Sequence, residues 1–288
     1  MNVMAQAQAT LSIDLGGTKM LAALVRDRTV LETHKMATPR GGDPAEWLQA
    51  LFDAIAMWNG RYDKVGVAVT GIVDDGHWSA INRNTLDIPD RFPLTDVVAA
   101  LSGSPVLAAN DAQAAAWGEF SFGAGRREDM VFLTVSTGIG GGIVVNGRLL
   151  GGLAGHFGQF RLDEATHHTL EDQVSGHWIA GEASVHQKDA TAREVFAAAD
   201  AGQEWARRIV EASARQTALL CRNIQLALDP KRIVIGGGIG LAPGYLTSIE
   251  RALGDLPPRL KPSIHAAELG ENAGVVGIAD LAERQQQL

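Results

Sequence analysis

Three glycine-rich clusters, each placed directly after a strand-like apolar segment, are the feature that most constrains how this chain can fold. The 288 residues include 33 glycines, well above the average usage of about 7%, and the excess gathers at 14–19, 134–142 and 236–240. Glycine adopts positive φ without cost and lets backbone approach a ligand closely. The clusters therefore predict ligand-binding loops rather than a flexible linker.

The first cluster joins two predicted strands, residues 11–15 and 20–25. Backbone N–H groups in a turn of this kind can hold phosphate. We predict that phosphate is held by four residues of this turn, Gly16, Gly17, Thr18 and Lys19. Asp14 lies near the end of the first strand and is predicted to hold Mg²⁺ directly or through water. The alternative is a plain β-hairpin turn, which Gly-Gly pairs commonly form.

The second cluster follows a predicted strand at 131–135. We expect a glycine-rich turn over 136–142 and a return strand at 143–145. Preorganised amides and hydroxyls suit a charged group in transfer. The predicted phosphate ligands here are Thr137, Gly138 and Gly140. A flexible glycine hairpin is the alternative.

The third cluster follows a short apolar strand predicted at 232–235. We predict that Gly237 and Gly238 form part of the ATP site, because a glycine-rich turn lets a flat adenine ring lie against the backbone. This cluster is a weak signal when taken alone. Its weight comes from the repetition of strand and glycine loop along the chain.

Asn110 and Asp111 lie between a predicted strand at 106–109 and an alanine-rich helix at 112–120. One interpretation is a helix N-cap, which aspartate supplies well. The other makes Asp111 a general base that takes a proton from an attacking hydroxyl, since open α/β sheets bind ligands at the carboxyl ends of their strands. Both can hold together, because a helix N-terminus keeps a carboxylate ionised.

The order of elements predicts an α/β protein with two related domains and a cleft between them. Strand, turn and return strand occur twice, each time followed by alternating strands and helices. We expect a smaller N-terminal domain at 1–109 and a larger C-terminal domain at 110–271. A terminal helix near 272–288 is expected to pack back on the first. Three other helices are predicted. One begins at Asp43, which caps it, and the other two cover 192–201 and 203–228.

Composition excludes several classes of function. The net charge of −8 opposes binding to nucleic acid and to an anionic membrane. The single cysteine, Cys221, excludes an internal disulfide and a cysteine-clustered zinc site, and we expect it to be a packing residue. No run approaches the roughly 20 apolar residues of a membrane span, and the first ten residues lack a signal-peptide pattern. We expect a cytoplasmic protein that acts on small molecules.

In their order, the motifs at 14–19, 70–71, 110–111 and 136–142 resemble the ROK family of repressors, open reading frames and sugar kinases. The resemblance covers nearly the whole chain. It implies a two-domain actin/hexokinase-like (ribonuclease H-like) ATPase fold with an interdomain cleft, and a homodimer. The segments 110–117, 129–132, 151–156 and 240–246 are most similar to family members that phosphorylate N-acetylmannosamine. The implied reaction is the ATP- and Mg²⁺-dependent phosphorylation of the 6-hydroxyl of an N-acylated hexosamine, a step of sialic acid catabolism.

The same resemblance assigns roles to single residues. Asp111 is the implied catalytic base. His156 stands where most sugar kinases of the family carry glutamate, and Glu171 matches a sugar-binding glutamate. Taken without the family, His156 would be a surface histidine and Glu171 a solvated carboxylate. The implied sugar-binding set is Gly71, Asn82, Asn110, Asp111, His156 and Glu171.

The chain departs from the family at its structural zinc, which one histidine and three closely spaced cysteines hold. Gln159 stands at the histidine position, no cysteine is present in this segment, and residues 160–170 form a shorter segment. We therefore expect no structural zinc. A replacement metal site is the less favoured alternative, and its candidates are His167, His168 and His177. Aromatic packing could order the loop instead, through Phe157, Phe160 and Trp178.

Three other functions stay open. A glucokinase or fructokinase of the same family would keep the mechanism and change the sugar. A sugar-sensing transcriptional regulator would need a DNA-binding domain, and we expect none because thirteen residues precede Asp14. A non-catalytic sugar-binding relative would fit the altered zinc segment, although Asp111 and the three glycine loops argue against it.

Overall fold

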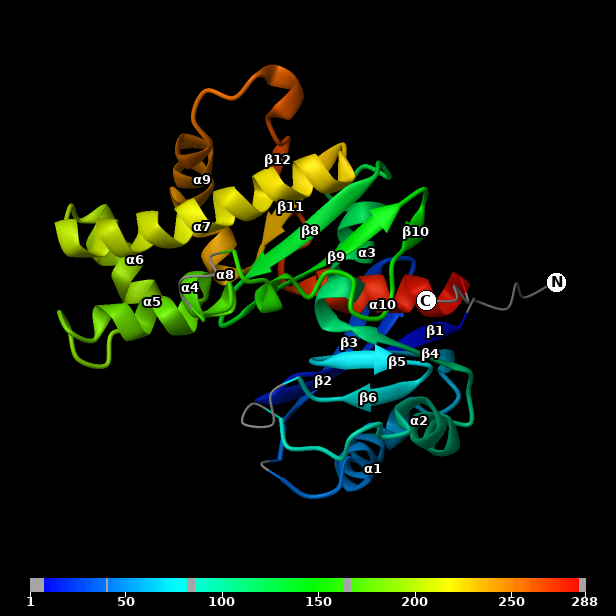
Figure 1. Cartoon of the computed structure of the whole chain (residues 1–288). Helices are drawn as coiled ribbons and strands as arrows, with labels where there is room; N and C mark the ends of the chain where they lie inside the picture. Colours follow the sequence, from blue (N-terminus) through cyan, green and yellow to red (C-terminus); the bar gives the residue numbers. More distant parts are fainter. Residues whose placement is uncertain (1–7, 40, 82–85, 163–166, 285–288) are drawn as a thin grey trace. The chain divides into compact units, whose positions relative to one another are not determined.

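The computed structural model describes residues 8–39, 41–81, 86–162 and 167–284. The chain forms two compact units, and each contains one five-stranded sheet (Figure 1). The first unit comprises Met1–Gly118, Leu149–Leu153 and Asn272–Leu288, and the second comprises Glu119–Arg148 and Ala154–Glu271. We predicted a boundary between residues 109 and 110, whereas the first unit continues through Gly118. Helix α3 (Asp111–Phe122) accordingly begins in one unit and ends in the other.

The sheet of the first unit has the strand order β3-β2-β1-β4-β7. β1, β2 and β3 are antiparallel neighbours, while β4 and β7 run parallel to β1. The strands are β1 (Ala9–Leu15), β2 (Lys19–Arg26), β3 (Thr29–Ala37), β4 (Tyr62–Val69) and β7 (Val106–Asn110). A separate hairpin is formed by β5 (Ile72–Asp74) and β6 (His77–Ser79). The helices are α1 (Pro44–Ala54), η1 (Ala56–Trp58), α2 (Leu94–Ser102), α3 and α10 (Ala273–Arg284).

Helices cover both faces of this sheet, so its central strands β1 and β4 are almost wholly buried. On one face, α1 and α2 pack on the strand side chains in a single hydrophobic cluster. On the other face, Val275 and Ala279 of α10 pack against Ala23 and Val25 of β2. Helix α1 begins as predicted, since the Asp43 carboxylate accepts the N–H of Ala45 at 2.9 Å.

Helix α10 approaches the rest of its unit almost backbone to backbone. The Ser12 hydroxyl donates to the carbonyl of Val275 at 2.9 Å. A Cβ on Gly66 of β4 would lie 2.5 Å from the carbonyl oxygen of Ile278, and one on Gly277 would lie 1.9 Å from that of Ala114. Such distances are closer than atoms can pack. Glycine at these two positions therefore allows the terminal helix to pack closely on β4 and on α3.

The sheet of the second unit has the order β10-β9-β8-β11-β12, which repeats the pattern of the first. β8 and β9 are antiparallel, and β11 and β12 run parallel to β8. This repetition confirms the predicted pair of related α/β units. The strands are β8 (Met130–Val135), β9 (Ile139–Val145), β10 (Arg148–Leu149), β11 (Arg232–Gly236) and β12 (Ile264–Ala266). The helices are η2 (Phe157–Gln159), α4 (Glu171–Val174), α5 (Gly176–Ala183), α6 (Ala192–Asp200), α7 (Glu204–Leu228), α8 (Gly237–Gly240), α9 (Tyr245–Leu253), η3 (Pro258–Leu260) and η4 (Gly270–Asn272).

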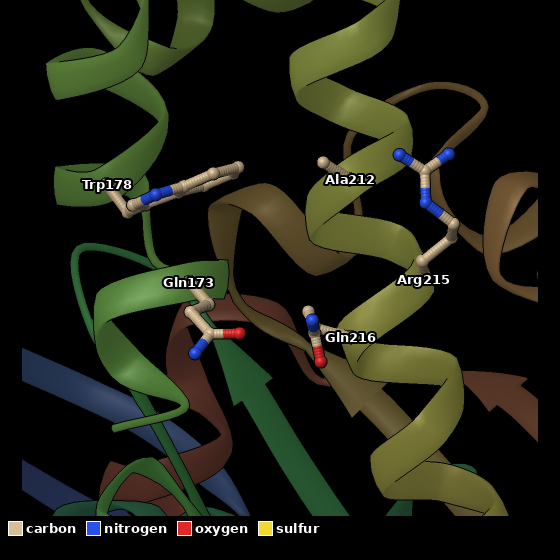
Figure 2. A pocket seen from close by; sticks show the side chains of 5 residues that line it. All are labelled: Gln173, Trp178, Ala212, Arg215 and Gln216. Carbon is tan, nitrogen blue, oxygen red and sulfur yellow. The ribbon is translucent and has the colours of Figure 1, made fainter. Parts of the chain in front are cut away.

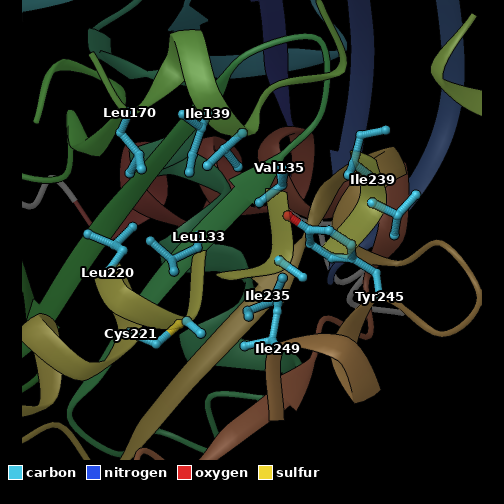
Figure 3. Packing of buried hydrophobic residues seen from close by; sticks show 14 of the residues in the cluster. Leu133, Val135, Ile139, Leu170, Leu220, Cys221, Ile235, Ile239, Tyr245 and Ile249 are labelled. Carbon is cyan, nitrogen blue, oxygen red and sulfur yellow. The ribbon is translucent and has the colours of Figure 1, made fainter. Parts of the chain in front are cut away.

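Residues of α7 and α9 pack with β8 and β11 in the core of the second unit (Figure 3). The buried hydroxyl of Tyr245 is bonded to Ser213 at 2.7 Å and to Thr217 at 2.9 Å. Burial raises the pKa of Tyr245 to about 12, so this phenol stays neutral. Cys221 is fully buried in the same core, which confirms its predicted packing role, and burial raises its pKa to about 12.

Helix α7 is amphipathic along its 25 residues and buries a single face, which includes Ile209, Val210 and Leu220. Its opposite face is polar, apart from single exposed side chains such as Leu226. Helices α6 and α7 lie within two residues of the predicted bounds, because caps and periodicity mark both of them. Over the described ranges of the chain, no helix combines the length and the apolar character needed to cross a bilayer.

The second glycine cluster differs from its prediction. Strand β9 begins at Ile139, so the expected turn over 136–142 is wrong for its second half, and the turn is confined to residues 136–138. Gly140, Gly141 and Gly142 pair with β8 instead. A Cβ on Gly141 would lie 2.2 Å from the carbonyl oxygen of Phe132. Close approach, rather than chain reversal, is therefore the reason for glycine in this strand.

Candidate active site

In the first unit, predicted site residues meet at one edge of the sheet. β1, β4 and β7 are parallel neighbours, so Asp14, Thr70 and Asp111 all lie at or just after carboxyl ends. The Thr70 hydroxyl donates to Oδ2 of Asp111 at 2.9 Å, and the N–H of Ala112 donates to Oδ1 at 2.7 Å. Because a carboxylate oxygen accepts more than one hydrogen bond, the half-buried Asp111 is fixed in orientation and keeps capacity for a further proton donor.

The Asp14 carboxyl is half-buried at the same edge. Burial, and next the negative charge of Asp111, raise the pKa of Asp14 to about 6, while Lys19 opposes this rise. Burial and the nearby Asp111 charge both disfavour the charge of the Asp14 carboxylate. A hard divalent cation prefers oxygen ligands and would relieve this penalty.

Replacing Asp14 by asparagine is expected to stabilise the ligand-free protein at pH 8 and to change it little at pH 4. The raised pKa means that the native state loses stability as the pH rises from 3.8 to about 6. The full difference corresponds to at most about 3 kcal/mol. Thermal unfolding with a chelator present measures it between pH 4 and 8. A gap in Tm that does not change with pH would contradict this explanation.

The first glycine cluster forms a tight turn between β1 and β2. The N–H of Gly16 donates to the carbonyl of Lys19 at 3.0 Å. Thr38, just beyond β3, holds the turn from outside, since its hydroxyl donates to the carbonyl of Gly16 at 2.7 Å and its N–H to that of Thr18 at 3.1 Å. The predicted hairpin is thus present. Gly17 is half-buried, and Thr18 and Lys19 are exposed, so their phosphate-binding role stays a prediction.

Asn110 is buried and bonded to the backbone around it. Its amide nitrogen donates to the carbonyl of Gly71 at 2.9 Å and to that of Val69 at 3.5 Å. Its Oδ1 accepts the N–H of Ala112 at 3.0 Å and that of Gln113 at 3.2 Å. Asn110 therefore caps α3 and ties it to the end of β4. A sugar hydroxyl would have to share the amide with these bonds, so the predicted sugar contact stays a prediction.

Gly71 follows Thr70 with a φ of +117°, and a Cβ there would lie 2.5 Å from the carbonyl oxygen of Ser79. Only glycine fits a backbone that is both left-handed and this close to a neighbour. The Trp78 indole donates to the carbonyl of Thr70 at 2.9 Å and fixes the same segment. Asn82, the remaining predicted sugar ligand of this unit, lies outside the described residues.

In the second unit, the second and third glycine clusters lie next to each other. β8 and β11 are parallel, and Gly236 pairs with Thr134. Gly237 has a φ of +85°, and a Cβ there would lie 2.3 Å from the carbonyl oxygen of Val135. The third cluster is a junction from strand to helix, because α8 begins at Gly237. Exposed Thr137 and exposed Gly238 lie on these two adjacent segments.

Glu171, the first residue of α4, contacts the turn at 136–138. Its Oε2 accepts the N–H of Ile139 at 3.1 Å. A Cβ on Gly138 would lie 2.5 Å from the same oxygen, and a Cβ on Gly158 would lie 3.3 Å from it. The structure therefore joins the predicted sugar ligand Glu171 directly to the predicted phosphate turn.

Half-buried His156 precedes η2 on a loop that lies over β9. A Cβ on Gly155 would lie 2.4 Å from the carbonyl oxygen of Gly141. Phe157 is buried and meets Phe160 edge to face, with 5.4 Å between ring centroids. The N–H of Leu170 donates to the carbonyl of Phe160 at 2.7 Å, which connects this loop to α4. Aromatic packing and a backbone bond thus order the segments that carry His156 and Glu171.

The described metal-binding side chains of this region do not gather into a site. Among the residues that the structure describes, no three His, Cys, Asp or Glu side chains form a group that could hold a metal ion. His167, His168 and His177 therefore form no such group. Trp178, which we expected to help order the loop, is half-buried and packs against the core of the second unit.

Sequence reasoning missed Glu119, a carboxylate that is 0% exposed. Its Oε1 accepts the N–H of Leu269 at 2.7 Å and that of Glu268 at 2.9 Å, and its Oε2 accepts the N–H of Ala124 at 2.9 Å. A Cβ on Gly123 would lie 2.1 Å from Oε2. The available signal was a charged residue on an otherwise apolar helical segment, followed by two closely spaced glycines.

A pocket of about 200 Å³ lies between α4 and α5 on one side and α7 on the other (Figure 2). The Trp178 indole extends toward Ala212 across the opening, and two amide side chains lie below it. None of its lining residues was predicted as a site residue; they are Gln173, Trp178, Ala212, Arg215 and Gln216.

Comparison with known proteins places this chain in a family. Residues 10–285 match the ROK family. The chain belongs to the ROK family. The bifunctional enzyme NanE/NanK of Brucella melitensis is 48% identical over 276 residues, which are 94% of this chain and 53% of that enzyme. The chain thus spans about half the length of that curated relative. The N-acetylmannosamine kinase of Citrobacter koseri is 40% identical over 286 residues, which are 96% of this chain and 99% of that protein.

Solved structures of ROK proteins share the fold. A ROK glucokinase from Streptomyces griseus, solved with glucose and AMPPNP, has a TM-score of 0.81 at 29% identity and covers 96% of this chain and 99% of its own. A ROK hexokinase from Thermus thermophilus has a TM-score of 0.80 at 30% identity, with the same coverage. The predicted two-domain actin/hexokinase-like fold is therefore confirmed for this ROK protein.

Proposed function

We propose that this protein is an ATP-dependent kinase that phosphorylates the 6-hydroxyl of an N-acylated hexosamine, with N-acetylmannosamine as the substrate. The orientation of Asp111 carries the proposal. Thr70 and the N–H of Ala112 fix its carboxylate at the carboxyl edge of three parallel strands, beside Asp14. A fixed, half-buried carboxylate at such an edge is suited to accept a proton from a substrate hydroxyl.

In the proposed reaction, Asp111 accepts the proton of the sugar 6-hydroxyl as that oxygen attacks the γ-phosphorus of ATP. A bond forms between this oxygen and the phosphorus, the bond to the β,γ-bridging oxygen breaks, and ADP leaves. The exposed turns at Thr18 and Thr137 offer backbone N–H and hydroxyl donors to the phosphates, and Lys19 offers a positive charge. Positioning and charge stabilisation supply most of the acceleration in phosphoryl transfer.

The carboxylates at this edge also suit a divalent cation. Asp14 would hold Mg²⁺ directly or through water, because burial and the Asp111 charge disfavour its own charge and a hard cation prefers oxygen ligands. When bound, the cation would neutralise phosphate charge. Asp111 stays the proton acceptor in this arrangement, because Thr70 and the N–H of Ala112 hold its carboxylate in one orientation.

The choice of sugar is supported by the relatives. Proteins named N-acetylmannosamine kinase are 40% identical in Citrobacter koseri and 38% identical in Escherichia coli, and this chain covers 99% of each. We propose Glu171, His156 and Asn110 as the sugar-binding residues. A cytoplasmic location, a homodimer and the absence of structural zinc belong to the same proposal.

A coupled ADP-release assay tests the function. Mg-ATP would be supplied with N-acetylmannosamine, N-acetylglucosamine, glucose, mannose or fructose in turn. We expect turnover on N-acetylmannosamine at a kcat/KM at least about tenfold above that on any other sugar, which is a difference of about 1.4 kcal/mol in transition-state binding.

The other outcomes separate the alternatives. Preference for glucose or fructose would keep the kinase and overturn the sugar. Sugar binding without ADP release would contradict the kinase and indicate a sugar-binding relative.

A further inference from the structure

The turn at 136–138 is held from two sides within the second unit. On one side, its carbonyls accept N–H groups of α5, from Gly176 to Ser136 at 2.7 Å and from His177 to Thr137 at 3.3 Å. On the other side, the N–H of Ile139 donates to Oε2 of Glu171 at 3.1 Å. The Ile139 bond is the point where a side chain outside the turn fixes the orientation of its backbone.

Glu171 is itself placed by packing. Its helix α4 is tied to α7, because the Ser213 hydroxyl donates to the carbonyl of Val174 at 2.9 Å. The carboxylate lies against Gly138 and Gly158, where a side chain would leave it no room. A hydrogen bond to an ionised acceptor is about twice as strong as a neutral one, so Glu171 contributes strongly to the position of the turn beside the two bonds from α5.

The two oxygens of Glu171 differ in what they contact. Oε2 accepts the Ile139 N–H and lies 2.5 Å from the Cβ position of Gly138, whereas Oε1 lies 3.8 Å from that position. Oε2 therefore lies closer to the phosphate turn than Oε1 does. A sugar hydroxyl that donates to Oε1 would fix the carboxylate plane, and with it the Ile139 bond.

We propose that Glu171 is a positioning residue that couples the two ligands, so that sugar bound at its carboxylate orders the phosphate turn for ATP. This inference rests on the proposed function and adds the physical link between the sugar and nucleotide sites. It predicts that the sugar tightens nucleotide binding and that the nucleotide tightens sugar binding by the same factor, because such coupling is reciprocal.

Isothermal titration of the full chain with AMPPNP and Mg²⁺, without and with saturating N-acetylmannosamine, measures the coupling. We expect the sugar to lower the Kd for AMPPNP by at least about fivefold. In Glu171→Ala, which lacks the carboxylate, we expect AMPPNP alone to bind about 10–100-fold more weakly. The effect of the sugar on the nucleotide should then be lost.

Two variants separate positioning from general damage. Glu171→Gln keeps an oxygen that can accept the Ile139 N–H, so AMPPNP affinity should return to within about threefold of the unaltered protein. The neighbouring carboxylate of Asp172, which is exposed and bonded to Thr169, supplies the matched control. Asp172→Asn should leave both Kd and coupling unchanged.

Gly138→Ala tests the route through the turn. Its Cβ would displace the Glu171 carboxylate, the end of a flexible side chain, while Glu171 itself stays present. We expect weaker AMPPNP binding in this variant and no further loss when it is combined with Glu171→Ala, because no carboxylate remains to be displaced. Additive losses in the double variant would overturn the route through the turn.

The failures of the two proposals are distinguishable. Equal coupling in Glu171→Ala and in the unaltered protein, with both ligands bound, would overturn this inference and leave the kinase intact. An unaltered protein that binds neither AMPPNP nor N-acetylmannosamine would overturn the proposed function and this inference with it.

Discussion

Replacing Asp111 by asparagine is expected to lower kcat for N-acetylmannosamine by about 10²–10⁴-fold, because removal of a positioned general base has effects of this size. Asparagine keeps an oxygen that can accept the Thr70 hydroxyl, whose bond to Asp111 is 2.9 Å long. Sugar and ATP should therefore still bind. Steady-state kinetics should show kcat and kcat/KM falling together, which is the pattern for an interaction made in the transition state.

The control for Asp111 is another acidic side chain in the first turn of a helix of the same unit. Asp96 is exposed in the first turn of α2. Asp96→Asn removes a comparable helix N-terminal charge, and its kcat should stay within about twofold of the unaltered protein. If Asp111→Asn keeps more than about a tenth of kcat, Asp111 is not the base.

The sheets could be predicted where the sequence is apolar and bounded by turn residues. The runs at 65–69 and 131–135 correspond to the cores of β4 and β8, and both are buried. β3 was missed, because it is an edge strand whose residues are mostly exposed and polar, so neither a continuous apolar run nor a clean alternation marks it. The predicted strand at 143–145 is shorter than β9, because the glycines in the first half of β9 resemble a turn.

The candidate site could be predicted in pieces but not as a network. Asp14 and Asp111 were found because one lies near the end of a strand and the other directly follows one, and the carboxyl ends of parallel strands share one edge. The bond between Glu171 and Ile139 joins residues that are 32 positions apart, and no periodicity or motif reports such a contact. The bond between Thr70 and Asp111 could not be predicted either, because it depends on the pairing of β4 with β7.

Glu119 shows how a residue without a recognisable motif can control a fold. Its carboxylate is fully buried, and the donors that the structure assigns to it are backbone N–H groups of two separate segments, at Ala124 and at Glu268 and Leu269. Ala124 lies just after α3, and Glu268 and Leu269 lie just after β12, so the bonds to Glu119 link these two parts of the chain. Buried N–H groups need hydrogen-bond acceptors, and this carboxylate supplies them for two loops, as a capping residue does at the end of a helix.

Replacing Glu119 by alanine should therefore lower the stability of the second unit by at least about 3 kcal/mol, since each buried N–H left without an acceptor costs about 1–3 kcal/mol. This corresponds to a fall in Tm of roughly 6–12 °C for a domain of this size. The Tm of Glu119→Gln should lie between that of the unaltered protein and that of Glu119→Ala. Both carboxylate oxygens accept N–H groups, whereas an amide offers one oxygen only. Differential scanning calorimetry of the three proteins measures the series.

The exposed Glu268 supplies the control, because its side chain pairs with Arg126 at the surface while its backbone N–H binds Glu119. Glu268→Gln removes that ion pair and leaves the buried bonds, so its Tm should stay close to that of the unaltered protein. An equal fall in Tm for Glu268→Gln and Glu119→Ala would assign the stability to the surface pair. An unchanged Tm in Glu119→Ala would mean that water replaces the carboxylate at these N–H groups, and the anchoring role of Glu119 would be lost.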